Sequence, residues 1–365
     1  MSQSRRDFLG GASTLGAALQ LTSSAGAQPV AAPWLSDRTR ALLASFGLNI
    51  PIFQAGFGSC TSIPLAAAVS NAGAMGALGS LNAQTAKDRV AGLLAATKRP
   101  FFVNMILQLF PTNPPNILPI CLDAGTRILQ FSWGLPSAEA VRMIRSSGAR
   151  FGVQVTSKEN ARAALDTGAD FLICQGTEAG GHVQAHRGLY EALPIVLEEA
   201  KDRPVLAAGG IGDGAGIYKA LSAGASAVVL GTRFVATRES NAHDEYKRAL
   251  VGAKASDTAL TLCFQTGWPA LHRVLRNSTF LAWEAAGCPS AGKRPGEDDA
   301  LFTRADGFQV RRYFNNPPLV GCEGRIREAA LYAGLGVGAV RDLPSAADLV
   351  KRLWAETETA HRAAR

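Results

Sequence analysis

Short apolar runs alternate with alanine-rich or amphipathic stretches between residues 50 and 231. The runs are almost continuously apolar, which predicts parallel strands that are covered on both faces. These strands are expected at residues 50–55, 75–79, 101–106, 127–133, 150–155, 170–176, 204–209 and 227–231. Helices are expected between them at residues 65–72, 85–97, 137–146, 157–167, 189–200 and 214–221. The proline-rich connection at 108–123 predicts a loop with a short helix.

Eight strands at regular strand–helix spacing predict the α/β class and, within it, a (β/α)8 barrel. A doubly wound sheet uses the same units and is the alternative. Eight units favour closure, because an open parallel sheet rarely reaches eight strands in so short a stretch. Glycines gather at the carboxyl ends of the runs, which is the end where barrel sites lie.

The strand–helix rhythm is lost after Thr232, and the chain divides accordingly. Residues 28–239 are expected to form the barrel. A smaller second domain, acting on the substrate side or as a lid, is expected at 240–325, inserted after strand eight. Residues 326–365 regain a helical pattern and are expected to return to the barrel as C-terminal helices.

Residues 1–27 are typical of an export signal and are set apart from the fold. Arg5 and Arg6 precede a weakly apolar stretch, and Ala25-Gly26-Ala27 resembles a cleavage site. Paired arginines in this position are typical of a twin-arginine signal. We therefore expect the twin-arginine export machinery as a partner and a periplasmic or exported location. Because that route carries folded proteins, we also expect a cofactor that is inserted before export.

The composition narrows the function classes. The chain has 365 residues, of which 47% are hydrophobic and 18% charged, so it is too apolar for a disordered protein. Its net charge of +8 comes from dispersed Lys and Arg, and only 7% of residues are aromatic, which argues against a nucleic-acid binder. No later segment reaches the roughly 18 unbroken apolar residues of a membrane span.

The six cysteines form no CxxC pair and no Cys/His cluster, which argues against a metal site. Cys60, Cys121 and Cys174 lie in or beside apolar runs and are expected to be buried. A disulfide among Cys263, Cys288 and Cys322 stays open, because the sequence does not select a pair.

Two strand ends predict a phosphate site. Gly209 and Gly210 follow the seventh run, while Gly231 and Thr232 follow the eighth. In barrels, the loops after strands seven and eight commonly bind phosphate through backbone N–H groups. A tight turn would explain one glycine pair equally well, but two such ends on consecutive strands favour an anion site.

His182 follows two glycines on the loop after the sixth run. Histidine is the side chain that titrates near neutral pH without perturbation, so this position suits proton exchange with a bound ring or substrate. A histidine on a flexible surface loop is the alternative.

An ordered set of short motifs resembles the nitronate monooxygenase family, formerly called 2-nitropropane dioxygenases. The motifs span about residues 48–250, and the resemblance resumes at 332–353. They are Pro51-Ile52-Phe53-Gln54-Ala55, Asn71-Ala72-Gly73-Ala74-Met75-Gly76, Val103-Asn104, Glu178-Ala179-Gly180-Gly181-His182, Ala208-Gly209-Gly210-Ile211, Gly231-Thr232-Arg233-Phe234 and Tyr332-Ala333-Gly334-Leu335-Gly336-Val337.

The resemblance implies FMN as the cofactor, no metal, and a role for each matching residue. His182 corresponds to the family's catalytic histidine. The positions implied to bind FMN are Gln54, Ala55 and Gly56 near the ring, Asn104 at the ring edge, Gln154 near the pyrimidine end, Gln175 and Gly180 along the ring or ribityl chain, and Gly209, Gly210, Gly231 and Thr232 at the phosphate.

Two positions depart from the family pattern. Leu335 replaces a usual Gln in the late motif, which removes a polar group expected near cofactor or substrate. Phe57 follows Ala55-Gly56 where the family has a Pro-containing segment, and it would add apolar surface to the pocket.

The resulting hypothesis is oxidative denitrification of alkyl nitronates or nitroalkanes with O2, giving a carbonyl compound and nitrite. One alternative keeps FMN and makes the chain an NAD(P)H-dependent reductase of quinones or enoyl thioesters. Another alternative is a binding protein that has lost catalysis. The presence of His182 and of the strand-end glycines argues against this alternative.

Overall fold

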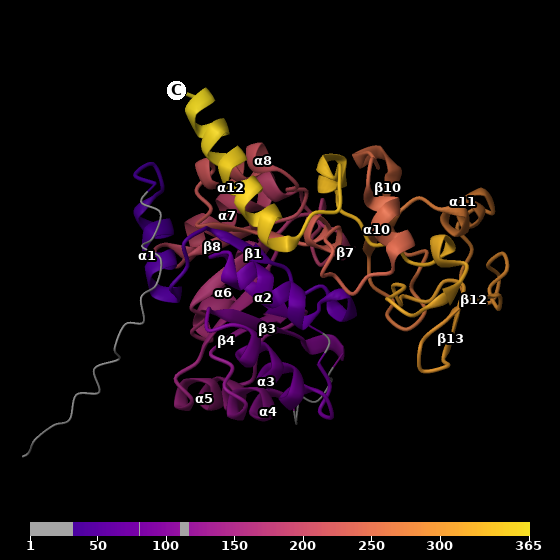
Figure 1. The fold of residues 1–365 in the computed structure, drawn as a ribbon, viewed down its shortest axis with the longest axis horizontal. Coiled ribbons are helices and arrows are strands. Elements are labelled where there is room, and N and C mark those ends of the chain that lie inside the picture. The colour runs from indigo at the N-terminus through magenta and orange to yellow at the C-terminus, as the bar shows by residue number, and fades with distance from the viewer. Residues whose placement is uncertain (1–31, 80, 110–116) are drawn as a thin grey trace, which may run out of the picture.

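Eight parallel strands form the barrel that the apolar runs predict, with helices packed around it (Figure 1). The computed structural model describes residues 32–79, 81–109 and 117–365; the predicted export signal at 1–27 lies outside them. The barrel strands are β1 (Ile52–Gln54), β2 (Gly76–Leu78), β3 (Phe101–Ile106), β4 (Ile128–Ser132), β5 (Arg150–Val155), β6 (Phe171–Gln175), β8 (Val205–Ala208) and β9 (Ala227–Leu230).

The sheet closes on itself, which excludes the doubly wound alternative. The strand order is β1-β9-β8-β6-β5-β4-β3-β2. The two ends then meet through a parallel bridge between Phe53 and Met75. Two backbone bonds of 2.9 Å secure it, from the Gln54 N–H to the Met75 carbonyl and from the Met75 N–H to the Ile52 carbonyl.

The predicted helices lie where the sequence places them. Ser137 and Ser157 cap two of them by accepting backbone N–H bonds from Ala140 and Asn160. The helices of the barrel are α1 (Asp37–Phe46), α2 (Ile63–Asn71), α3 (Ala86–Ala96), α4 (Ile117–Asp123), α5 (Ala138–Ser146), α6 (Lys158–Asp166), α7 (Leu189–Ala200), α8 (Gly214–Ser222) and α9 (Thr232–Val235).

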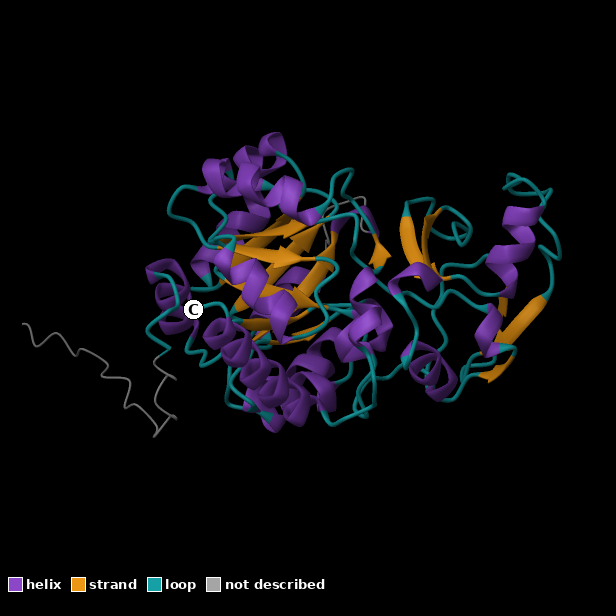
Figure 2. Cartoon of the chain, turned by 90° about the horizontal axis from the view of Figure 1, so that it is seen from above, coloured by secondary structure: helices purple, strands orange, loops and turns teal. Residues whose placement is uncertain are grey.

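Residues 240–345 form a smaller second lobe beside the barrel (Figure 2). It holds two three-stranded sheets, β10-β11-β7 and β13-β12-β14. Its elements are α10 (Asp244–Leu250), β10 (Thr258–Thr261), β11 (His272–Leu275), α11 (Ser278–Ala285), β12 (Ala300–Thr303), β13 (Gln309–Arg311) and β14 (Glu323–Gly324). The strand β7 (Gly181–His182) comes from the loop between β6 and α7, so a barrel loop completes a sheet of the lobe.

The expectation of helices throughout residues 326–365 is wrong for its first half. Residues 326–345 form two short 3-10 turns, η4 (Ile326–Glu328) and η5 (Leu335–Ala339), and they pack into the second lobe. The glycines at 334, 336 and 338 interrupt a regular helix there.

Only α12 (Ala346–Ala363) returns to the barrel, where it packs against α8 and α2. Leu349, Leu353 and Trp354 on this helix join the barrel core. None of the helices within the described residues combines the length and apolar character that crossing a membrane requires.

Candidate functional site

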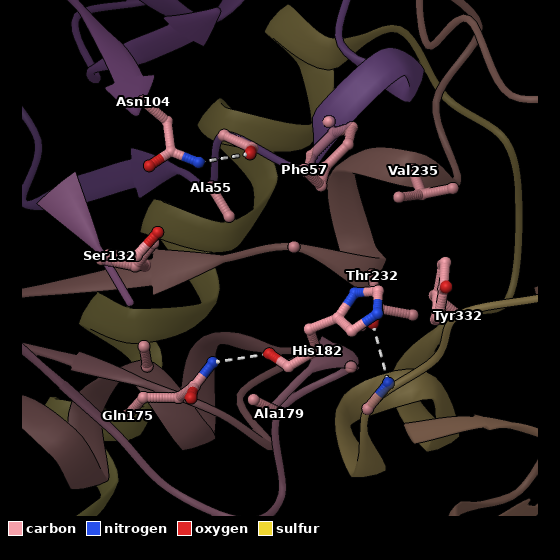
Figure 3. A pocket seen from close by; sticks show the side chains of 18 of the residues that line it. Ala55, Phe57, Asn104, Ser132, Gln175, Ala179, His182, Thr232, Val235 and Tyr332 are labelled. Carbon is pink, nitrogen blue, oxygen red and sulfur yellow. Dashed lines mark hydrogen bonds between the residues drawn. The ribbon is translucent and has the colours of Figure 1, made fainter. Parts of the chain in front are cut away.

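A cavity of about 380 Å³ opens at the carboxyl ends of the barrel strands, where the second lobe meets the barrel. This volume lies within the usual range of small-molecule sites. Of the twelve predicted site residues, eleven line it: Ala55, Gly56, Asn104, Gln154, Gln175, Gly180, His182, Gly209, Gly210, Gly231 and Thr232 (Figure 3).

Gln54 is the predicted site residue that the structure places elsewhere. Its side chain is fully buried between β1 and β2, where Nε2 donates to the Ala77 carbonyl at 3.1 Å and Oε1 accepts from the Ala77 N–H at 3.3 Å. Successive residues of a strand point to opposite sides, so Ala55 lines the cavity while Gln54 does not. The role of Gln54 is to hold the two strands at which the barrel closes.

Asn104 is held with one end of its amide free. Its Nδ2 donates to the Gly56 carbonyl at 2.9 Å, whereas its Oδ1 is buried with no hydrogen-bond partner among the described residues. A Cβ on Gly56 would lie 2.4 Å from the Asn104 Cβ, so glycine is required for this approach. The site therefore offers an unpaired acceptor to a ligand donor.

The glycines after β8 serve the protein's own packing. Gly209 and Gly210 have positive φ angles of 117° and 71°, and a Cβ at either would press on the loop after β6, 3.1 Å from the Ala179 nitrogen or 2.9 Å from the Glu178 Cβ. Gly231 differs, because a Cβ there would meet only the Ala55 Cβ at an ordinary 3.7 Å. Residue 231 is thus the strand-end glycine that could carry a side chain without strain.

Thr232 and Gly180 join the barrel to the late motif. The Thr232 Oγ1 accepts from the Gly334 N–H at 3.0 Å, which leaves its hydroxyl proton to donate. A Cβ on Gly180 would lie 2.4 Å from the Gly334 nitrogen, so the two backbones touch here. Leu335 donates its N–H to the Glu178 carbonyl at 3.0 Å and does not line the cavity.

Two glutamines hold the segment that carries His182. The Gln175 Nε2 donates to the His182 carbonyl at 3.3 Å, and its Oε1 accepts from the Gln184 N–H at 2.9 Å (Figure 3). Gln154 in turn donates to the side-chain oxygen of Gln184. Both glutamines line the cavity, yet these bonds make them supports of the histidine segment.

His182 lies at the seam between the barrel and the lobe. Its backbone pairs with His272 in β11, and its ring stacks on Trp268 with centroids 3.9 Å apart and planes 20° from parallel. Tyr332 packs against the same ring at 5.4 Å. The Nε2 is buried with no hydrogen-bond partner among the described residues. Burial, and then the neighbouring His272, lower the pKa of His182 to about 3, so the imidazole is neutral at neutral pH.

Glu178 does not orient His182. Its Oε2 accepts from the Leu189 N–H at 2.9 Å and so caps the start of α7. His186 is exposed, and the His243 ring accepts from the Glu245 N–H at the start of α10. Cys60 lines the cavity, but burial raises the pKa of its thiol to about 12, which keeps it protonated and poorly nucleophilic.

The second lobe supplies a set of cavity-lining residues that the sequence does not predict together. Asn315, Asn316 and Pro317 line the cavity together with Trp268 and Tyr332. Tyr332 belongs to the late motif, but no periodic or motif signal marks the other four. On the barrel side, Ser132 and Trp133 also line the cavity, as their position at the carboxyl end of β4 predicts.

All six cysteines are free in this structure, and Cys288 is the exposed one. Within the described residues, no group of three or more His, Cys, Asp and Glu side chains could hold a metal ion.

These features define a class of protein: an α/β-barrel enzyme with a ligand cavity at the strand carboxyl ends, and with a histidine under a second lobe whose Nε2 has no hydrogen-bond partner among the described residues. Nitronate monooxygenase sequences match residues 39–356, and the chain belongs to this family of oxidoreductases. The nitronate monooxygenase of Pseudomonas aeruginosa strain PAO1 is 32% identical over 88% of this chain and 99% of its own length.

The chain is also similar to two proteins with other names. The structure of a nitroalkane oxidase from Streptomyces ansochromogenes is similar with a TM-score of 0.71 and 31% identity, covering 89% of this chain and all of that one. A hydroxy-methyl-oxo-octahydro-indene-carboxyl-CoA dehydrogenase of Mycobacterium tuberculosis strain H37Rv is 30% identical over 84% of this chain and 92% of its own length.

Proposed function

We propose that the chain is an FMN-dependent enzyme that oxidises alkyl nitronates or nitroalkanes with O2 to a carbonyl compound and nitrite. The observation that carries the proposal is the neutral imidazole of His182, whose buried Nε2 has no hydrogen-bond partner among the described residues, in a cavity bounded by strand-end glycines. Atoms balance when two nitronates and one O2 yield two carbonyl compounds and two nitrite ions.

The residues present fit FMN. The buried Asn104 Oδ1 lacks a donor, and the Thr232 hydroxyl retains a proton for an anionic oxygen. A Cβ at Gly231 would meet only the Ala55 Cβ, so there is open space beside this residue, and N–H groups at the start of a helix have no intrahelical acceptor. These residues would hold the ring edge and the phosphate. Bound FMN would supply the electron transfer from nitronate to O2 that amino-acid side chains cannot provide.

The contribution of His182 is a proton transfer. With a neutral nitroalkane, the C–H bond at the α-carbon breaks, its proton moves to an imidazole nitrogen, and its electron pair spreads onto the nitro oxygens. The imidazolium and the nitronate then carry opposite charges side by side, which offsets the cost of charging a buried ring. A preformed nitronate does not need this step.

Replacing His182 with Asn tests the proposal. We expect FMN content and fold to persist, because β7 pairs through its backbone. The kcat/KM for a neutral nitroalkane should fall about 10²- to 10⁴-fold, the usual contribution of a positioned general base. The kcat/KM for the preformed nitronate should fall much less. Equal losses on both substrates would mean that His182 binds the anion, and no loss on either would remove it from catalysis.

A second candidate function is an NAD(P)H-dependent reductase of quinones or enoyl thioesters. The observation in its favour is the 30% identical relative whose name specifies a CoA thioester. Anaerobic titration separates the two functions. Loss of the flavin absorbance on adding nitronate supports the first, and loss of that absorbance only on adding NADH or NADPH supports the second.

A further inference from the structure

Trp133 lies in the turn that follows β4, and its backbone is strained. Its φ angle is 61°, in the left-handed region that bulky L-residues rarely adopt. Three other non-glycine residues among those described have a positive φ, and Trp133 is the one of the four that lines the cavity. Such strain persists where the surrounding structure imposes it, and it gathers at active sites and ligand sites. A glycine at residue 133 would allow the same turn without strain, so the backbone alone does not explain a tryptophan here.

The turn that carries Trp133 is held in place at the rim of the cavity. The ladder between β3 and β4 ends at Ser132. Gly134 has a φ of 145°, and a Cβ built on it would lie 3.4 Å from the Leu107 Cβ, so the turn rests on that residue. Gly134 and Leu135 are exposed, whereas Trp133 is half-buried. The indole of Trp133 therefore forms part of the cavity wall close to solvent.

The indole reaches the aromatic ring that covers His182. The Trp133 ring packs edge-on against Trp268, with centroids 4.8 Å apart and planes at 66°, which is a favourable arrangement of two aromatic rings. Trp268 in turn stacks on His182 with centroids 3.9 Å apart. All three residues line the cavity. Two ring contacts thus join the strained turn of the barrel to the histidine, and the Trp133 indole occupies the space beside that stack.

We propose that Trp133 sets the width of the substrate that fits beside His182, and so makes the cavity selective for narrow alkyl nitronates and nitroalkanes over those that carry an aryl group. The inference rests on the proposed function and names a specificity-determining residue for it. Protein interiors are close-packed, so a substituent that overlaps the indole has to displace it. Displacement would move the strained turn or break the contact with Trp268, and that cost falls on the bulky substrate alone.

Trp133→Ala should open this space. The probes are the nitronates of nitroethane and of (2-nitroethyl)benzene, which share the reacting carbon and differ by a phenyl group on the next carbon. The ratio of kcat/KM for the phenyl probe to kcat/KM for nitroethane nitronate should rise at least about tenfold, as for other changes of pocket size. The value for nitroethane nitronate and the FMN content should change little.

Two results would overturn the inference. One is an unchanged ratio in Trp133→Ala. The other is an equal loss on both probes, because Trp133 would then act only as a support for Trp268 and His182.

Two control variants separate the indole from the rest of the turn. Trp133→Phe keeps an aromatic ring and should keep a ratio near that of the wild type. Leu135 belongs to the same turn, but it is 40% exposed and does not line the cavity. Leu135→Ala should therefore change neither value. A rise of the ratio in Leu135→Ala as large as in Trp133→Ala would assign the selectivity to movement of the turn and overturn the role of the indole.

Trp133→Gly gives a second variant without the indole and tests the strain. Glycine adopts a φ of 61° at no steric cost, whereas alanine keeps the strain. Trp133→Gly should therefore resist urea better than Trp133→Ala, and it should show the same rise of the ratio. An alanine variant as stable as the glycine variant would contradict the strained turn on which the inference is built.

Anaerobic calorimetry on the FMN-loaded protein keeps the inference separate from the proposed function. Without any turnover, the dissociation constant of the phenyl nitronate should fall in Trp133→Ala and Trp133→Gly relative to that of nitroethane nitronate. If it falls but neither probe is oxidised by any variant, the role of Trp133 stands and the proposed activity fails. If the probes are oxidised but the ratio of their dissociation constants is the same in all variants, the proposed activity stands and the role of Trp133 fails.

Discussion

The barrel and the second lobe build opposite sides of one cavity by different means. The barrel side consists largely of backbone and small residues at strand ends, such as Gly56, Gly209 and Gly231, held by a closed parallel ladder. The lobe side consists of large side chains, above all Trp268 and Tyr332, carried on short antiparallel strands and loops. A backbone surface suits a constant cofactor, whereas side chains can be exchanged to fit different substrates.

Packing follows the same division. The barrel interior is one continuous apolar cluster that includes α12. The lobe has several small clusters joined by ion pairs, for example Arg312 with Asp299 at 3.1 Å and with Glu328 at 2.7 Å. His182 belongs to both regions, because its chain segment leaves the barrel and its strand partner lies in the lobe. The comparison predicts that changes at the strand-end glycines of the barrel act on FMN, and that changes at the large side chains of the lobe act on His182.

Among the changes that test this comparison, Gly231→Asp on the barrel side has the largest expected effect. Residue 231 has a φ of −102° and room for a Cβ, so an aspartate fits the fold but adds negative charge where the phosphate is proposed to bind. We expect the Kd for FMN to rise at least about 100-fold, equivalent to about 2.7 kcal/mol. Flavin absorbance after dialysis measures the retained cofactor.

Gly231→Ala is the matched control and should keep FMN. Gly210 is a poorer target, because its φ of 71° and the 2.9 Å approach to Glu178 would disturb the loop with any side chain. An aspartate variant that folds and retains all of its FMN would move the phosphate site away from β9.

The barrel half of this comparison could be predicted from the sequence. Continuous apolar runs and helix-start residues such as Ser157 are local signals, and the closed parallel sheet follows from repeating them eight times. The strand-end glycines and His182 lie where the motifs place them. Gln54 was misplaced, because a motif match does not say to which side of a short strand a side chain points.

The lobe half could not be predicted. The pairing of β7 with β11 joins residues about ninety positions apart, and a two-residue strand has no periodicity to detect. Trp268 lies in an irregular loop, so no sequence signal places its ring on His182.

Trp268→Ala should give the next largest effect, on the histidine instead of the cofactor. Trp268 is 6% exposed and its indole covers one face of the His182 ring, and burial is the main reason for the low pKa of that histidine. Removing the indole should raise the pKa of His182 toward its usual value. It should also lower kcat/KM for a neutral nitroalkane about tenfold at pH 7, because the imidazole loses the stacked ring that fixes its position. FMN content should stay unchanged.

The pH profile of kcat/KM distinguishes a raised pKa of His182 from a general loosening of the structure around residue 268. In the wild type, His182 should cause no loss of activity between pH 8 and pH 5. In Trp268→Ala an acid limb should appear nearer pH 6.5. Trp268→Phe keeps a stacked ring and should keep the wild-type profile. An alanine variant with an unchanged profile would show that Trp268 does not set the pKa.

The smallest expected effect concerns His272, which is fully buried in β11 behind His182. Its Nε2 accepts from the Phe264 N–H at 3.0 Å, and its Nδ1 contacts the Ala270 carbonyl at 2.9 Å, so Nδ1 carries the single proton. A second proton would break the bond to Phe264 and leave a charge in the interior. Burial accordingly lowers the pKa of His272 to about 4.

This histidine makes the stability of the fold depend on pH with a definite sign. Between about pH 4 and 6.5 the unfolded chain binds a proton at residue 272 that the folded chain does not, so the free energy of unfolding falls as the pH falls. The slope from one such group is at most about 1.4 kcal/mol per pH unit. His272→Asn should be less stable than the wild type at pH 7, since the Phe264 N–H loses its acceptor. The variant should nevertheless lose less stability than the wild type between pH 7 and pH 5, as measured by urea unfolding. An equal loss in both proteins would place the acid sensitivity elsewhere in the chain, because an asparagine side chain at this position has no proton to gain.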